Sequence, residues 1–165
     1  MERVDKQVRE ILALPRDAGK IKREAADMRR LLEEEKPARD IWDLKLISGG
    51  LIDLEFIAQV AVLTGNVKGE EATATGAVLA SLTDDFCSPQ ARQELMDAHE
   101  LYTTLTQITR LCLEGGFDPE EAPPGFADLL LRQTDLPELP VLAAHVEETA
   151  AKVRKRFAEL IGMLD

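Results

Sequence analysis

The chain has 165 residues, of which 45% are hydrophobic, 31% charged and only 4% aromatic, and its net charge at pH 7 is −11. This balance fits one globular domain with its own core and excludes a disordered chain, while the acidity argues against nucleic acid or an anionic membrane surface as a partner. Because no apolar run is long enough for a membrane span or a signal peptide, the sequence predicts a cytoplasmic protein.

Apolar side chains recur at helical spacing along most of the chain, and no segment shows the sustained alternation of a β-strand. With so few aromatic residues, the core must consist mainly of Leu, Ile, Val and Ala, which favours helix-on-helix packing. The pattern predicts helices over about residues 2–13, 17–35, 51–63, 89–113, 125–132 and 141–164, and a shorter helix within residues 69–83. We therefore expect an all-α bundle of about five to seven helices in a single domain, residues 1–165, with the two long C-terminal helices paired antiparallel.

The first two predicted helices are amphipathic. Their apolar stripes are Val4, Val8, Ile11 and Leu12 in the first helix, and Ile21, Ala25, Met28 and Leu32 in the second. The charged residues of the second helix, Arg29, Arg30 and 33–35, are expected on the other side, as a solvated face.

Cysteine and histidine give no sign of a metal site. Cys87 and Cys112 have no CxxC spacing and are expected to be reduced thiols packed in or near the core. His99 and His145 lack further ligand residues at helical spacing, so no metal site is predicted.

The helix over residues 51–63 carries the most information. An irregular or extended stretch from Ile41 to Ser48 precedes it, and the pair Gly49-Gly50 opens it. Because the helix is apolar nearly all round, we expect it to be the buried central helix, yet it contains three polar residues. Glu55 and Gln59 are four residues apart and share one face, whereas Asp53 points to another side and lies in the first turn, where the helix dipole favours a negative charge. These three residues are Asp53, Glu55 and Gln59.

The residues alone leave two interpretations of this segment open. Lys45 is a natural counter-ion, so Glu55 and Lys45 could form an internal ion pair that holds the loop to the bundle, with Asp53 no more than an N-terminal charge. Alternatively, the Gly49-Gly50 turn at a helix start could bind an anion such as a phosphate.

Asp53 and Glu55 also look like the acidic pair of a nucleotidyltransferase active site, but the spacing does not fit. That site places its acids on a strand, where residues two apart lie on the same side, while a helix turns them about 200° apart. A carboxylate-pair enzyme built on Asp53 and Glu55 is disfavoured for the same reason.

The segment from Trp42 to Gln59 resembles a motif of the bacterial glutamine-synthetase adenylyltransferases. The motif has the form D-[LIV]-K-x-x-x-G-G-[LI]-x-[DE]-[IL]-E-F-[IL]-x-Q. The matching residues are Asp43, Leu44, Lys45, Gly49, Gly50, Leu51, Asp53, Leu54, Glu55, Phe56, Ile57 and Gln59. Ile52-Asp53, where N-terminal halves of that family carry Arg-Glu, is similar to the C-terminal half.

The resemblance implies a helical domain that follows a nucleotidyltransferase domain, which this chain does not contain. In that family the enzyme transfers AMP from ATP to glutamine synthetase and removes it by phosphorolysis. The resemblance therefore implies ATP and Mg²⁺ for the parent enzyme, with no cofactor, metal ligand or catalytic residue in this chain. Implied partners are the nucleotidyltransferase domain, glutamine synthetase and the PII signalling protein.

Within the motif, Lys45, Gly49 and Gly50 are expected to contact a phosphate or the catalytic domain. Asp43, Asp53, Glu55 and Gln59 are expected to have structural or interface roles. Whether the chain acts as an enzyme is left open at this stage, since it lacks the metal-binding acids of the family. The alternative is a stand-alone interaction module that binds PII or glutamine synthetase without chemistry.

Overall fold

The computed structural model describes residues 2–12, 14–69 and 74–162. Over these residues the chain forms seven α-helices and no β-sheet, which confirms the predicted all-α class. Among the same residues, no helix is both long and apolar enough to cross a membrane. The helices are α1 Glu2–Leu12, α2 Ala18–Glu35, α3 Leu51–Leu63, α4 Thr75–Ala80, α5 Pro89–Cys112, α6 Pro124–Thr134 and α7 Leu139–Leu160.

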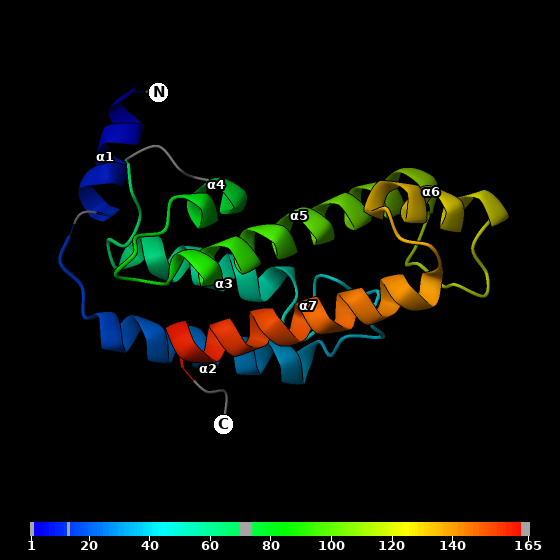
Figure 1. Ribbon diagram of the computed structural model, residues 1–165. Coiled ribbons are helices and arrows are strands. Elements are labelled where there is room, and N and C mark those ends of the chain that lie inside the picture. The colour runs from blue at the N-terminus through cyan, green and yellow to red at the C-terminus, as the bar shows by residue number, and fades with distance from the viewer. Residues whose placement is uncertain (1, 13, 70–73, 163–165) are drawn as a thin grey trace.

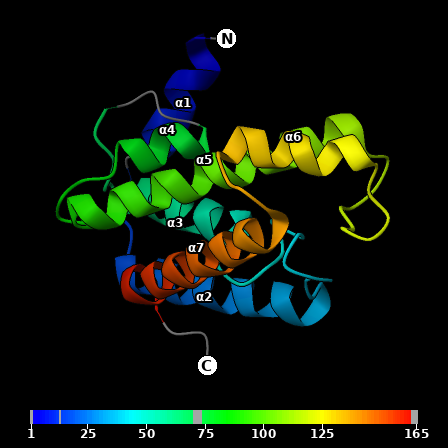
Figure 2. The same ribbon diagram turned by 45° about the vertical axis from the view of Figure 1, so that its right-hand side comes forward.

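Helix α3 lies at the centre of the bundle, in contact with α2, α4, α5 and α7 (Figure 1). The long helices α5 and α7 run antiparallel, as predicted, and α6 packs on both at one end of the molecule (Figure 2). Seven residues of α3 are buried, so its predicted central position is confirmed. Helix α3 is therefore the element against which α2, α4, α5 and α7 all pack.

The N-terminus of α5 follows from two residues. The Ser88 side chain accepts a hydrogen bond from the backbone N–H of Ala91, and Pro89 stands at the first helical position, where no N–H is needed. The inner face of α5 buries Leu95, Ala98, Tyr102 and Leu105, and the C-terminal end of the helix emerges into solvent. Cys112 lies there and is exposed, whereas Cys87 is buried; both thiols are free.

The sequence predicts a short helix within residues 69–83, and helix α4 confirms it. Helix α4 spans only Thr75–Ala80, and residues 70–73 lie outside the described part of the chain. Beyond Ser81 the chain is extended, because Thr83 N–H donates to the Asn66 carbonyl and Lys68 N–H donates to the Ser81 carbonyl. This short pairing with the segment after α3 replaces further helical hydrogen bonds.

The stretch from Ile41 to Ser48 is a series of tight turns, so of the two predicted forms, irregular or extended, the irregular one is confirmed. The backbone N–H groups of Leu46 and Ile47 both donate to the Asp43 carbonyl, at 2.9 and 3.0 Å. Trp42 anchors the stretch: its ring meets the ring of Phe117 edge-on at 4.8 Å, and Phe117 packs on Phe126 of α6 at 5.2 Å. Aromatic packing thus ties the turns to the α6 end of the bundle.

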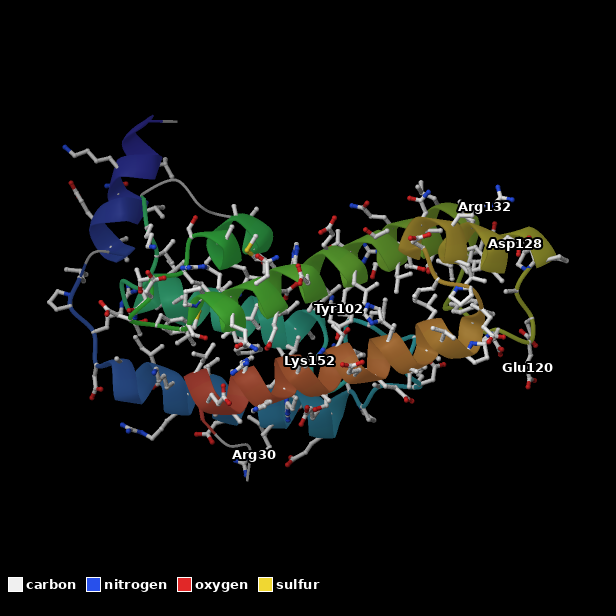
Figure 3. The ribbon with its side chains drawn as sticks, viewed as in Figure 1. Arg30, Tyr102, Glu120, Asp128, Arg132 and Lys152 are labelled. Atoms are coloured by element: carbon white, nitrogen blue, oxygen red, sulfur yellow. The ribbon has the colours of Figure 1, made fainter. Side chains whose placement is uncertain are left out.

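Tyr102 is the only tyrosine of the chain, and it lies wholly inside the bundle. Figure 3 shows it pointing inward from α5, whereas Arg30 projects from α2 away from the bundle. The Tyr102 hydroxyl donates to the Gly49 carbonyl at 3.0 Å. Burial, and after it the charge of Asp53, raises the pKa of Tyr102 above its ordinary value.

This raised pKa predicts a loss of stability in alkaline solution. An unfolded tyrosine ionises at a pKa of about 10. The unfolded chain therefore loses this proton before the folded chain does, and the free energy of unfolding should fall as the pH rises above that value. Because Tyr102 is the sole tyrosine, tyrosinate absorbance at alkaline pH reports on it alone. With circular dichroism confirming that the chain is folded, a tyrosinate midpoint near the unfolded value would contradict the prediction. Tyr102→Phe should remove this component of the pH dependence.

Candidate functional site

Asp53 is the centre of the site: its side chain is completely buried, in the first turn of α3. One carboxylate oxygen accepts a hydrogen bond from Nε of Arg29. The other accepts from the backbone N–H of Gly49 at 2.7 Å and from Arg154 at 3.0 Å. A buried carboxylate is costly unless it is paired and hydrogen-bonded, and here both requirements are met.

Arg29 is fully buried, so the prediction that it belongs to a solvated face of α2 was wrong. Besides Asp53, its guanidinium donates to the carbonyls of Leu46 and Ile47, at 3.4 and 3.3 Å. The delocalised, multi-donor guanidinium suits this position, because one side chain satisfies a carboxylate and two carbonyls at once. Arg29 therefore joins α2 to α3 and to the turns before it.

Arg154 of α7 completes the arrangement from the opposite side. Its guanidinium bridges Asp53 and Glu33, with N–O distances of 3.0 and 2.9 Å, and Glu33 also lies 3.2 Å from Arg29. These four residues, Arg29, Glu33, Asp53 and Arg154, are called the buried charge network below. It links three helices, α2, α3 and α7, which are far apart in sequence.

Lys45 is not the counter-ion of this segment, which corrects the earlier expectation. The carboxylate of Asp53 is neutralised by arginines, and Lys45 is exposed, with no ion pair to Asp53 or Glu55. Glu55 is exposed as well, so the interpretation of a Lys45–Glu55 ion pair was wrong. Gln59 shares the exposed face of α3 with Glu55, as the helical spacing predicted.

The Gly49-Gly50 turn is buried, and its N–H groups have internal partners. Gly49 N–H donates to Asp53, and Gly50 N–H donates to the Ile47 carbonyl at 2.9 Å. The next two, of Leu51 and Ile52, donate to the carbonyls of residues 44 and 45. A helix N-terminus binds a phosphate through N–H groups that lack partners, so this geometry offers little to an anion.

Gly49 has a second structural role, which only glycine can fill. Its φ is +81°, in the left-handed region that L side chains rarely adopt, and a Cβ at this position would overlap the Ala150 carbonyl of α7. The absence of a side chain at Gly49 therefore lets the turn pack directly against the backbone of α7, beside the buried charge network.

Asp43, another residue of the motif, stabilises the turns from outside. Its side chain is 13% exposed and lies 3.7 Å from Nε of Arg39, while its carbonyl accepts the two turn hydrogen bonds described above. No three His, Cys, Asp or Glu side chains in the described ranges gather closely enough to hold a metal ion. An open hollow beside α6, lined by Asp128, Arg132 and Asp135, contains none of the residues predicted for the site (Figure 3).

The burial of Arg29 could have been predicted from its position in the helix, but the charged residues next to it suggested a solvent-exposed face. Arg29 follows Ala25 by four residues and Ile21 by eight, so helical spacing alone places it on the apolar face of α2. Arg154 carries a weaker signal, next to the buried Val153 and four residues after the buried Ala150. Nothing in the sequence pairs either arginine with Asp53, since these contacts join segments 24 and 101 residues apart.

Fold and site together define a class: an α-helical bundle domain organised around a buried carboxylate that is held by arginines from two other helices. No protein-family model and no solved structure matches the chain. Curated sequences do match it.

The chain is homologous to one region of the bifunctional glutamine synthetase adenylyltransferase/adenylyl-removing enzymes. It is 58% identical over 159 residues to the enzyme of Mesorhizobium japonicum, which covers 96% of this chain and 16% of that enzyme. Identity is 43% over 165 residues with the Agrobacterium fabrum enzyme and 42% over 161 residues with that of Brucella suis, with 98% and 97% of this chain covered. The chain spans 16 to 17% of the length of these relatives, so it corresponds to a fragment of the larger enzyme.

The buried charge network predicts effects of very different size for two acidic residues of the motif, Asp53 and Glu55. Asp53→Asn removes the fully buried counter-charge of Arg29, which then keeps only the partly exposed Glu33, and the free energy of unfolding should fall by about 3–5 kcal/mol. The matched change Glu55→Gln, on the exposed face of the same helix, should change it by less than about 0.5 kcal/mol. Urea unfolding of both variants measures the difference; equal effects would contradict the assignment of Asp53.

Alanine substitutions at two glycines separate backbone strain from close packing. Gly49 and Gly65 both have positive φ, +81° and +71°, but only at Gly49 would a Cβ meet other atoms within 4 Å. Gly65→Ala should therefore cost about 1–2 kcal/mol of stability, from the left-handed backbone alone. Gly49→Ala should cost about 1–3 kcal/mol more, because α7 must move away. Thermal or urea unfolding tests this, and similar losses at both positions would be the contrary result.

Proposed function

We propose that the chain is the C-terminal helical domain of a bifunctional enzyme that adenylylates and deadenylylates glutamine synthetase. The observation that carries the proposal is the 58% identity to the Mesorhizobium japonicum enzyme over 96% of this chain. The motif between Trp42 and Gln59 supports the same assignment. In this role the domain completes the cleft of a nucleotidyltransferase domain and helps to regulate nitrogen assimilation.

The geometry supports two different roles for the residues of the motif, one for the buried residues and one for the exposed residues. Gly49, Gly50 and Asp53 are buried and act within the domain. Lys45, Glu55 and Gln59 are exposed, on a segment held rigidly by the buried charge network, and are the members of the motif best placed to touch another domain. We assign the contact with the nucleotidyltransferase domain to these three residues. A rigid scaffold favours such a role, because binding then costs little ordering of the surface.

Chemistry in the parent enzyme would come from ATP and Mg²⁺ bound by the nucleotidyltransferase domain. Glutamine synthetase would be its protein substrate, in line with the name of the related enzymes. The PII signalling protein is a further proposed partner, and the cytoplasm is the proposed compartment. The role of this chain is accordingly positioning and regulation, with the reacting groups supplied by the catalytic domain.

A hybrid enzyme tests the proposal. The matching segment of the Mesorhizobium japonicum enzyme is replaced by this chain, and AMP transfer to and from glutamine synthetase is measured. The hybrid should be active, and the isolated chain with ATP and Mg²⁺ should be inactive. A folded but inactive hybrid, or AMP transfer by the isolated chain, would refute the proposal.

The same hybrid tests the exposed face of α3. Glu55→Gln should lower the rate of AMP transfer several-fold while leaving the stability of the domain unchanged. The control is Glu120→Gln, an exposed glutamate at the α6 end of the molecule (Figure 3). If both variants transfer AMP at the rate of the hybrid, Glu55 does not contact the catalytic domain.

A further inference from the structure

Helix α1 exposes an apolar stripe that the bundle does not cover. The side chains of Val4, Val8 and Ile11 are 61%, 48% and 56% exposed, and Leu14, just after the helix, is 58% exposed. These four residues are called the α1 stripe below. The sequence predicted an amphipathic first helix, but the structure leaves Val4, Val8 and Ile11 of its apolar stripe exposed.

The position of α1 explains why the stripe is open. Figure 1 shows α1 standing off one end of the molecule, and no helix of the described chain makes more than marginal contact with it. A helix of 11 residues is marginally stable in water without tertiary packing. An apolar surface that covered the stripe would supply the missing stabilisation.

We infer that the α1 stripe docks into an apolar groove on another part of the same polypeptide, outside the region that this chain represents. The inference rests on the proposed function, in which the domain is one part of a longer enzyme. The relatives support it, because this chain accounts for 16% of the length of the Mesorhizobium japonicum enzyme. Residues 4, 8 and 11 have the i, i+4, i+7 spacing of a helix that lies in a groove.

The size of the stripe favours a partner in the same polypeptide. A stable interface between separate proteins takes roughly 20–30 residues from each partner, and the α1 stripe has far fewer. Within one polypeptide, the effective concentration of a linked surface reaches about the millimolar range, so a small contact is sufficient.

Charge argues against a second copy of this chain as the occupant. Each copy carries a net charge of −11, and two such chains repel each other. The helix itself is balanced: its three acidic residues, Glu2, Asp5 and Glu10, are matched in number by Arg3, Lys6 and Arg9.

Amide hydrogen exchange in the hybrid enzyme tests the inference. The backbone N–H groups of α1 should exchange at least tenfold more slowly in the hybrid than in the isolated chain. The triple variant Val4→Gln, Val8→Gln, Ile11→Gln keeps good helix formers in α1 but removes its apolar side, and it should abolish this protection. Unchanged protection of α5 shows that the bundle is still folded, and the single variant Val8→Gln should give a partial loss.

Leu111→Gln is the matched control. Leu111 is 86% exposed near the C-terminal end of α5, so the same type of change there should leave α1 protected. Fast exchange of α1 in a folded, active hybrid would overturn the docking inference while leaving the proposed function intact. An inactive hybrid with a protected α1 would do the reverse. A dimer of the isolated chain in sedimentation, converted to monomer by the triple variant, would identify a second copy as the occupant and also overturn the inference.

Discussion

The buried carboxylate of Asp53 is the constraint on which the rest of this structure depends. A charge without solvent must find its partners inside the protein, and Asp53 finds one on α2, one on α7 and one in the backbone of Gly49. Because the guanidiniums are directional donors, these contacts restrict how the three segments can pack together. Replacing such a group by an apolar residue could keep the helices packed, but it would not define their register so strictly.

The same constraint explains the glycine turn. Gly49 presents its N–H to Asp53 and its carbonyl to Tyr102, so both of its backbone polar groups are used inside the bundle. A left-handed residue without a side chain is needed there because α7 passes directly over it. The Gly49-Gly50 turn, which resembles a phosphate-binding turn in sequence, therefore serves here to let α7 pack closely. The exposed residues of the motif lie around this turn.

Most of the fold could be predicted from the sequence, and the predictions that failed did so for identifiable physical reasons. The ends of α3 and the start of α5 were predicted correctly, because an apolar run after Gly49-Gly50 and the Ser88-Pro89 cap are local signals. The pairing of residues 81–83 with residues 66–68 was not predicted, because no local pattern reveals these contacts. Arg29 was assigned to solvent on charge alone, although its helical position favoured burial.

The sequence by itself determined the helical class, the central position of α3 and the separation of Asp53 from Glu55, because all three follow from periodicity and helix geometry. It also contained the motif that relates the chain to the adenylyltransferases. Only the tertiary structure decided which cations neutralise Asp53, which motif residues are buried, and that the apolar side of α1 stays open. These outcomes depend on contacts between distant segments, and the energy of a buried charge is set by where its partners lie in space.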